Sequence, residues 1–195
     1  MVDTIGAVVN GEGRKRAWLS ASLHVIGATT TAGLLGIGLG IVGSLLGAPW
    51  GPIGPAVVVV FAALYLFRET LNVPVPIPQS RRQVPDWWRS FYTAPTAAFM
   101  FGAGLGIGFL TFLSYGTFVV VAAAAVVSGD PVVGAVLCGP FGLARSAAVA
   151  VTAHRKIEVR PFTHRLEALA ETPVGRVVNA TSLAAVVLGG ATRLL

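Results

Sequence analysis

The chain has 195 residues, of which 54% are hydrophobic and 11% are charged, and its formal net charge is +6. A water-soluble domain of this size would lack sufficient polar surface, so the composition argues against an ordinary soluble protein. Lys and Arg occur in short clusters beside apolar runs, which is typical of membrane topology signals and argues against nucleic acid as a partner. We expect the lipid bilayer to surround most of the chain.

Two long stretches, Trp18 to Phe67 and Thr93 to Gly129, contain no charged residue. About 20 helical residues cross the hydrocarbon core, and a helix satisfies its own backbone hydrogen bonds there. The sequence therefore predicts an all-α, polytopic membrane protein with about five transmembrane helices. Residues 1–16 form a cytoplasmic N-terminal segment, and residues 17–195 form a single membrane-embedded domain. The predicted spans are residues 17–47, 50–67, 95–127, 131–153 and 177–192, with cytoplasmic loops at 68–94 and 154–176.

The third span is predicted to be broken. Residues 95–127 would form a helix about 50 Å long, which is too long for one straight crossing and too short for two. The polar interruption at Ser114 to Thr117 leaves only Phe118 to Val127 before the next turn. Those residues cannot recross the bilayer, so we expect a single crossing broken near Ser114 to Thr117.

The distribution of positive charge predicts the orientation, because Lys and Arg in short loops remain cytoplasmic. With five crossings, every Lys and Arg except Arg145 and Arg193 falls on one side. The N-terminus is therefore predicted inside and the C-terminus outside a cell membrane (plasma or inner). An odd number of spans excludes a complete internal duplication.

Small and aromatic residues indicate how the spans pack and where they end. Glycines four residues apart allow helix backbones to approach closely, so we expect the first and third spans to cross at short range. Tryptophans beside apolar runs are typical anchors at the membrane surface. The packing candidates are Gly36, Gly40, Gly43, Gly47, Gly102, Gly104, Gly106 and Gly108, and the anchor candidates are Trp18, Trp50, Trp87 and Trp88.

Five residues are candidates for a substrate or translocation site. Arg145 is predicted near the middle of the fourth span, where a charge is costly and usually functional, although it could equally pair with backbone carbonyls or extend to the surface. Cys138 precedes Gly139-Pro140, where a proline should kink the helix, and the alternative is a small buried apolar residue. Ser114, Tyr115 and Thr117 could face both residues, or could only satisfy backbone groups freed by the break.

The sequence shows no metal-ligand cluster, no nucleophile beside a base and no phosphate-binding loop. We therefore expect no metal, no cofactor and no enzymatic activity.

The chain resembles the transmembrane cytochrome c biogenesis and thiol-disulfide interchange family (CcdA/DsbD-like) over residues 13–195. The resemblance rests on a basic run before a Gly-rich span, a short second span, a polar break in the third span and a cysteine before a Gly-Pro pair. These features are Arg14-Lys15-Arg16 to Gly47, the span ending at Arg68, Arg81 to Pro85, Ser114 to Thr117, and Cys138-Gly139-Pro140-Phe141.

The chain departs from that family in two features that carry its function. The resemblance implies one reactive cysteine in the first span and another in the fourth, which pass reducing equivalents across the membrane. Here the family's first span and the cysteine pair are missing, because Cys138 is the only cysteine. A self-contained dithiol relay is excluded, whereas a mixed disulfide with a partner remains open.

Three functions are compatible with the sequence. A small-solute or ion translocator explains the broken helix and Arg145. A non-transporting subunit or assembly factor of a larger membrane complex explains the scarcity of ionisable residues, with the Gly-rich faces contacting other membrane subunits or further copies of the chain. A transmembrane redox conduit is the third reading, and replacing Cys138 with Ser would test it.

Overall fold

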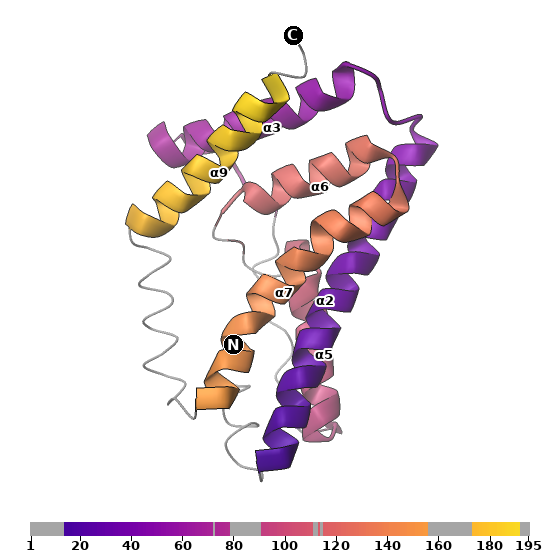
Figure 1. The fold of residues 1–195 in the computed structure, drawn as a ribbon, viewed down its shortest axis with the longest axis vertical. Helices are drawn as coiled ribbons and strands as arrows, with labels where there is room; N and C mark the ends of the chain where they lie inside the picture. Colours follow the sequence, from indigo (N-terminus) through magenta and orange to yellow (C-terminus); the bar gives the residue numbers. More distant parts are fainter. Residues whose placement is uncertain are drawn as a thin grey trace. The chain divides into compact units, whose positions relative to one another are not determined.

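The computed structural model of the chain describes residues 14–71, 73–78, 91–110, 113, 115–155 and 173–191. These residues form six α-helices and one short 3-10 helix, with no strand among them (Figure 1). In chain order the elements are α2 (Arg14–Leu45), α3 (Ile53–Leu71), α5 (Ala94–Gly106), η1 (Gly108–Leu110), α6 (Thr117–Ser128), α7 (Pro131–Arg155) and α9 (Pro173–Ala191).

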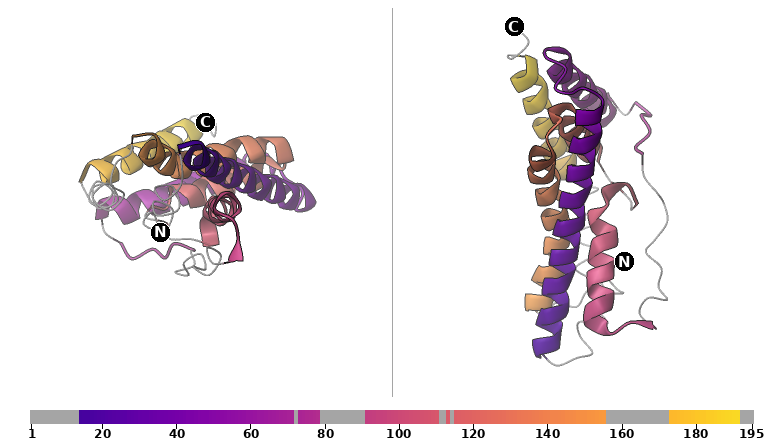
Figure 2. Two further views of the ribbon diagram at one scale, coloured as in Figure 1. Left: turned by 90° about the horizontal axis from the view of Figure 1, so that it is seen from below. Right: turned by 90° about the vertical axis from the view of Figure 1, so that its right-hand side faces the viewer.

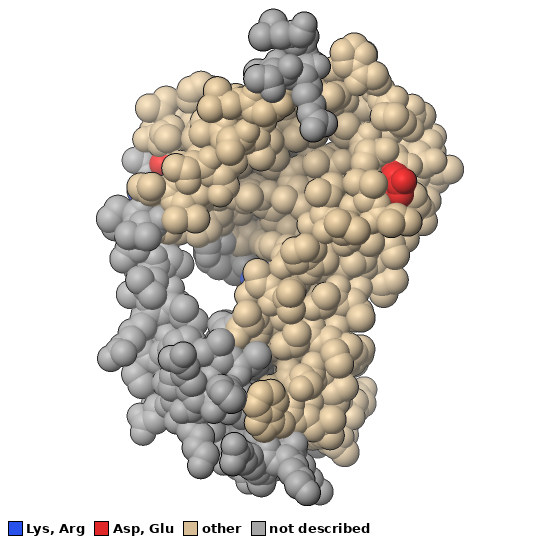
Figure 3. All heavy atoms as spheres, viewed as in Figure 1, with Lys and Arg blue, Asp and Glu red and all other residues tan. Residues whose placement is uncertain are grey.

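Two of the described helices are long and apolar enough to cross a membrane: α2 over Trp18–Leu45, and α3 over Ile53–Leu71. Apolar segments that are shorter occur in α6, over Thr117–Ser128, and in α7, over Pro131–Ala147. The described part of the face drawn in Figure 3 carries almost no Lys, Arg, Asp or Glu. The all-helical class is confirmed for the described residues, whereas the count of five spans stays a prediction.

The apolar run from residue 95 to residue 127 is divided between two helices. Helix α5 ends at Gly106, and Ile107 follows with φ −77° and ψ 82°, outside the helical region. Helix α6 then begins at Thr117. The interruption thus begins about seven residues before the predicted break at Ser114. Gly106 and Gly108 flank Ile107, and glycine is among the weakest helix formers. The glycines can therefore end α5 at a point where the sequence has no polar side chain.

The turn between α6 and α7 follows from its residue types. Gly129 has φ 59° and donates its N–H to Val126 O at 3.1 Å, which closes α6 in the left-handed conformation that glycine tolerates. Asp130 then caps α7, because its Oδ1 accepts the N–H groups of Val132 and Val133 at 2.7 and 3.2 Å. Pro131 occupies the first helical position, where its missing N–H has no cost. Helix α7 continues through Pro140 to Arg155.

The described residues fall into two compact units. The first contains described residues of Met1–Ala32, Gln79–Phe112 and Gly139–Glu167. The second contains described residues of Gly33–Pro78, Leu113–Cys138 and Ala168–Leu195. Helices α2 and α7 each contribute one segment to both units.

In the first unit, the N-terminal part of α2 packs against α5 (Figure 2). Two α2 side chains donate hydrogen bonds to α5 carbonyls: His24 Nδ1 to Ala98 O at 3.1 Å, and Thr31 Oγ1 to Ala103 O at 2.9 Å. These contacts progress in the same order along both helices, so α2 and α5 run in the same direction. Gly102 meets the backbone of His24, which permits the close approach.

In the second unit, α3 packs along α9 and also contacts α6. Ala62 of α3 and Leu183 of α9 are completely buried in this core. The C-terminal part of α2 meets the start of α7 through glycines, because Gly36 and Gly134 each lie directly against the other's backbone. This arrangement brings the end of α3, the start of α6 and the first turns of α9 together, and that is where the polar side chains of this unit lie.

Candidate functional site

The end of α3 carries a paired charge that is largely shielded from solvent. Arg68 Nη1 lies 2.6 Å from Glu69 Oε1, and the side chains are 28% and 6% exposed respectively. Arg68 Nε also donates to Val75 O at 3.0 Å, and Tyr65 donates its hydroxyl to Pro76 O at 3.2 Å. These bonds hold the segment Val73–Pro78, which has no regular secondary structure, against the end of α3. The Glu69 carboxylate is thus neutralised locally.

The start of α6 lies beside this ion pair. Gly116 is the N-cap residue and makes no side-chain cap hydrogen bond. It packs so tightly on the Tyr65 ring that a Cβ atom would collide with the ring. Thr117, the first residue of α6, donates its hydroxyl to Asn179 Oδ1 of α9. The break in the apolar run therefore presents a new helix N-terminus to a polar side chain from another helix.

Asn179 is a buried polar residue with unused hydrogen-bonding capacity. It is 8% exposed, and its Nδ2 has no hydrogen-bond partner among the described residues. An unpaired buried amide costs about 1–3 kcal/mol, so its donors call for a partner. Arg176 lies three residues earlier on α9, on a similar face of the helix, and is exposed. The bond to Thr117 shows that Asn179 lies on the side of α9 that faces the start of α6.

Of the five predicted site residues, Tyr115 and Thr117 belong to this cluster, and Ser114 lies outside the described residues. Cys138 belongs to the same unit but lies on α7, and Arg145 belongs to the other unit. The joint site formed by all five residues stays a prediction.

Arg145 and Cys138 have different surroundings. The Arg145 guanidinium lies over the Phe141 ring, 5.3 Å from its centroid, in a cation–π contact along α7. Cys138 is a free thiol with 0% exposure. It lies one helical turn from Gly134, which packs against Gly36. The thiol therefore occupies a tightly packed interior that shields it from reagents.

The predicted packing glycines divide between the two units. Gly36, Gly40 and Gly43 approach backbone atoms of α7, of the turn before it and of α6 in the second unit. Gly102 and Gly106 approach α2 at His24 and Ala28 in the first unit. Gly47 instead ends α2 with φ 81°, and no described atom lies within 4 Å of the position its Cβ would take. Gly104 is half-buried in α5, and Gly108 starts η1.

Two of the four predicted tryptophan anchors lie in the described part of the chain. Trp18 is exposed at the start of the apolar part of α2. Trp50 is half-buried and donates its indole N–H to Leu46 O at 3.0 Å, which stabilises the turn after α2. Trp87 and Trp88 lie outside the described residues.

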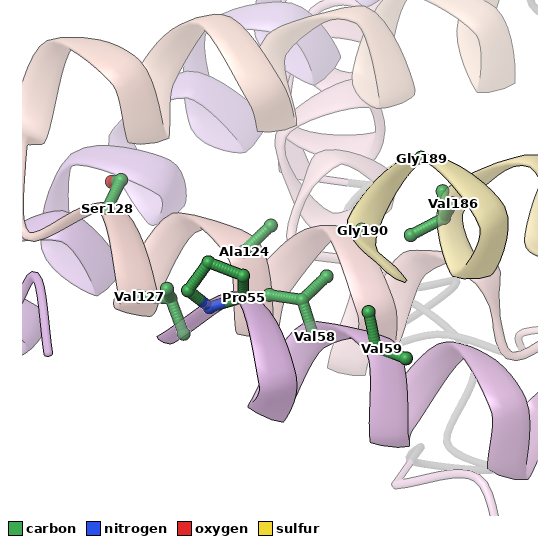
Figure 4. A pocket seen from close by; sticks show the side chains of 9 residues that line it. All are labelled: Pro55, Val58, Val59, Ala124, Val127, Ser128, Val186, Gly189 and Gly190. Atoms are coloured by element: carbon green, nitrogen blue, oxygen red, sulfur yellow. The ribbon is translucent and has the colours of Figure 1, made fainter. Parts of the chain in front are cut away.

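An apolar pocket of about 390 Å³ lies between α3, α6 and α9 in the second unit (Figure 4). Its lining residues are Pro55, Val58, Val59, Ala124, Val127, Ser128, Val186, Gly189 and Gly190. The hydroxyl of Ser128 already donates to Ala125 O at 2.7 Å. These lining residues therefore offer an apolar surface and no free hydroxyl donor, which suits aliphatic groups.

Asn179, Arg176 and the Arg68–Glu69 pair were not predicted as site residues from the sequence. The available signal was a single Asn within an apolar helix, in Val177-Val178-Asn179-Ala180. Such a residue is usually paired with another helix. Its partner Thr117 lies 62 positions earlier, so the pair is visible only in three dimensions.

Two curated proteins similar to the chain carry the same name. The methylamine utilization protein MauF of Paracoccus versutus is 31% identical over 137 residues, which cover 69% of this chain and 50% of that protein. MauF of Methylorubrum extorquens is 32% identical over 130 residues, which cover 66% of this chain and 46% of that protein. The chain thus spans about half the length of the curated relatives it matches. No family model matches the chain, and no solved structure matches it significantly.

These similarities correct the predicted family. The matching proteins are named MauF, and nothing supports membership of the CcdA/DsbD-like family. The features behind that resemblance were a basic run before a Gly-rich span, a short second span, a polar break in the third span and a cysteine before a Gly-Pro pair. Helical membrane proteins share such features because topology and close helix packing require them. The predicted membership of the CcdA/DsbD-like family was therefore wrong, and the expectation of a role in cytochrome c biogenesis, which rested on it, has no support.

Proposed function

We propose that the chain is a membrane-embedded accessory protein of methylamine utilization that acts by binding other proteins. The observation that carries this proposal is the similarity to two proteins named for methylamine utilization, at 31% and 32% identity. It favours the subunit or assembly-factor alternative over the translocator, which gains no support from these relatives. In this proposal the chain catalyses no reaction itself.

The membrane part of the proposal is supported by composition and by helix direction. Helices α2 and α3 are long and apolar enough to span, and Leu34 of α2 and Val60 of α3 are among their exposed large apolar side chains. Such side chains suit contact with lipid or with a partner helix. The parallel direction of α2 and α5 is compatible with a multi-pass arrangement in which the chain returns across the membrane between them. In the proposed topology the N-terminus is cytoplasmic.

Deletion of the gene in its own organism tests the biological role. The deletion strain is expected to lose growth on methylamine while growing normally on a substrate unrelated to methylamine. Growth should return when the full chain is expressed from a plasmid. Unchanged growth of the deletion strain on methylamine would overturn the proposal.

A second experiment tests the partner-binding role. The tagged chain is extracted from membranes of methylamine-grown cells in mild detergent, and the intact mass of its assembly is measured. A stoichiometric complex with a different protein is expected, and it should be absent from cells in which that protein has been deleted. A monomer or homo-oligomer alone would contradict an accessory role.

A further inference from the structure

We propose that the apolar pocket between α3, α6 and α9 binds an acyl chain of a phospholipid whose headgroup carries a primary ammonium, with that ammonium beside Asp130. The inference goes beyond the accessory role, and it rests only on the membrane part of the proposed function. Three properties of the second unit support it: the size and lining of the pocket, its place at three helix ends, and the charge of the turn next to it.

The pocket has the size and lining that an acyl chain requires. Its volume is about 390 Å³, and its lining residues are valine, proline, alanine and glycine, with Ser128 as their one polar member. In Figure 4 the labelled side chains lie in a row from Ser128 to Val186, which suits an elongated apolar group. One turn of an α-helix with its side chains is about 10 Å wide and about 5.4 Å long and fills about 400 Å³, so a partner helix could insert no more than a single turn.

The pocket lies at the ends of three helices. Pro55 is the third residue of α3, Ser128 is the last residue of α6, and Gly190 is the last but one of α9. In the predicted topology, all three of these ends are on the outer side of the membrane. A lipid of the outer leaflet can therefore keep its headgroup at the surface while one acyl chain enters the pocket.

The turn beside Ser128 supplies a negative charge and no positive one. Asp130 is exposed, and it is the only charged residue in the turns at residues 46–52 and 129–130. Its backbone nitrogen lies 3.3 Å from Ser128 Oγ, which places it next to the pocket lining. Its Oδ1 caps α7, which leaves Oδ2 for a further donor. Because the end of α6 adds the negative end of a helix dipole, a primary ammonium complements this surface, whereas an anionic headgroup would be repelled.

The lipid retained by the purified full chain tests the proposal. The chain is placed in bilayer discs that contain equal amounts of phosphatidylethanolamine, phosphatidylglycerol and phosphatidylcholine, and the lipids that stay on it are identified by native mass spectrometry. One phosphatidylethanolamine per chain is expected. In A124F the new ring would occupy the pocket, so this lipid should be lost. G189L should have the same effect, and it is expected to fold because no described atom lies within 4 Å of the position its Cβ would take.

The matched control is V60F, which also adds a ring. Val60 is 63% exposed and does not line the pocket, so V60F should keep the lipid. D130N removes the charge, and it should fold because asparagine caps a helix as well as aspartate does. Its preference for phosphatidylethanolamine over phosphatidylcholine should fall about two- to fivefold, the change expected for loss of an exposed charge pair.

The proposal is overturned if the wild type keeps no lipid, if it prefers phosphatidylglycerol, or if A124F and G189L keep as much phosphatidylethanolamine as the wild type. A dimer that both variants abolish would also overturn it, because a second copy would then fill the pocket. Washing the membranes at alkaline pH tests the membrane location separately. Release of the chain would contradict that location, whereas a chain that stays in the membrane without a retained lipid would contradict only the lipid site.

Discussion

Two glycines on α2 should respond in opposite ways to the same substitution. Gly36 lies against the backbone of Gly134, whereas Gly38, two residues later, has no described atom within 4 Å of the position a Cβ would take. Replacing glycine with alanine inside a helix gains about 0.5–1 kcal/mol of stability. G38A should gain that amount. In G36A, the new methyl group meets main-chain atoms that cannot rotate away, and overpacking of this kind costs about 1–3 kcal/mol.

The expected result is therefore a net loss of up to about 2.5 kcal/mol in G36A and a difference of about 1–3 kcal/mol between the two variants, which is the overpacking cost itself. Reversible unfolding of the purified protein in detergent would measure both values, with the wild type as reference. Both residues lie within one helix, so the comparison cancels general effects of adding a methyl group. Equal stabilisation of both variants would refute the close approach of α2 and α7 at Gly36.

Three further predictions concern single side chains. The Cys138 thiol has 0% exposure, so it should resist a maleimide reagent in the folded protein and react only after denaturation. Rapid labelling of the folded protein would contradict this burial. The Thr31 hydroxyl lies 2.8 Å from Gly27 O of its own helix and 2.9 Å from Ala103 O of α5, so its single proton is shared between the two carbonyls. T31V should lose up to about 0.6 kcal/mol through the missing bond to α5, whereas T30V should lose little, because the Thr30 hydroxyl bonds only to its own helix; equal losses in unfolding experiments would count against the cross-helix bond. R145K should unfold with about 0.5–1 kcal/mol less stability, because lysine stacks less well on the Phe141 ring, and an unchanged value would argue against that contact.

The positions of the helices could be predicted because hydrophobic runs and breakers act locally. The prediction for the first span, residues 17–47, corresponds to α2 at Arg14–Leu45, and the prediction of 131–153 corresponds to α7 at Pro131–Arg155. Gly47 ends the first of these helices in a positive-φ conformation, and Asp130 with Pro131 begins the second. These signals depend only on neighbouring residues, and therefore they can be read from sequence.

The break in the third apolar run was predicted, but its start was misplaced. The prediction relied on polarity at Ser114 to Thr117, because unpaired backbone groups need polar partners within a membrane. The structure ends α5 at Gly106, where the backbone approaches Ala28 and Thr31 of α2. The end of α5 thus coincides with a contact between helices far apart in sequence. Local polarity carries no information about such a contact.

The polar pair of Thr117 and Asn179 illustrates the same limit at the candidate site. The hydroxyl of Thr117 could be singled out because it borders the break, whereas Asn179 lies within a run of small and apolar residues. In the folded structure, the hydrogen bond between Thr117 and Asn179 constrains how α9 packs on α6. A shift of α9 by one residue would rotate Asn179 by about 100° and leave its buried amide without Thr117. Because an unpaired amide is costly in an apolar surrounding, the pair selects one register of α9. The same register places Arg176, three residues earlier, on a similar face of α9.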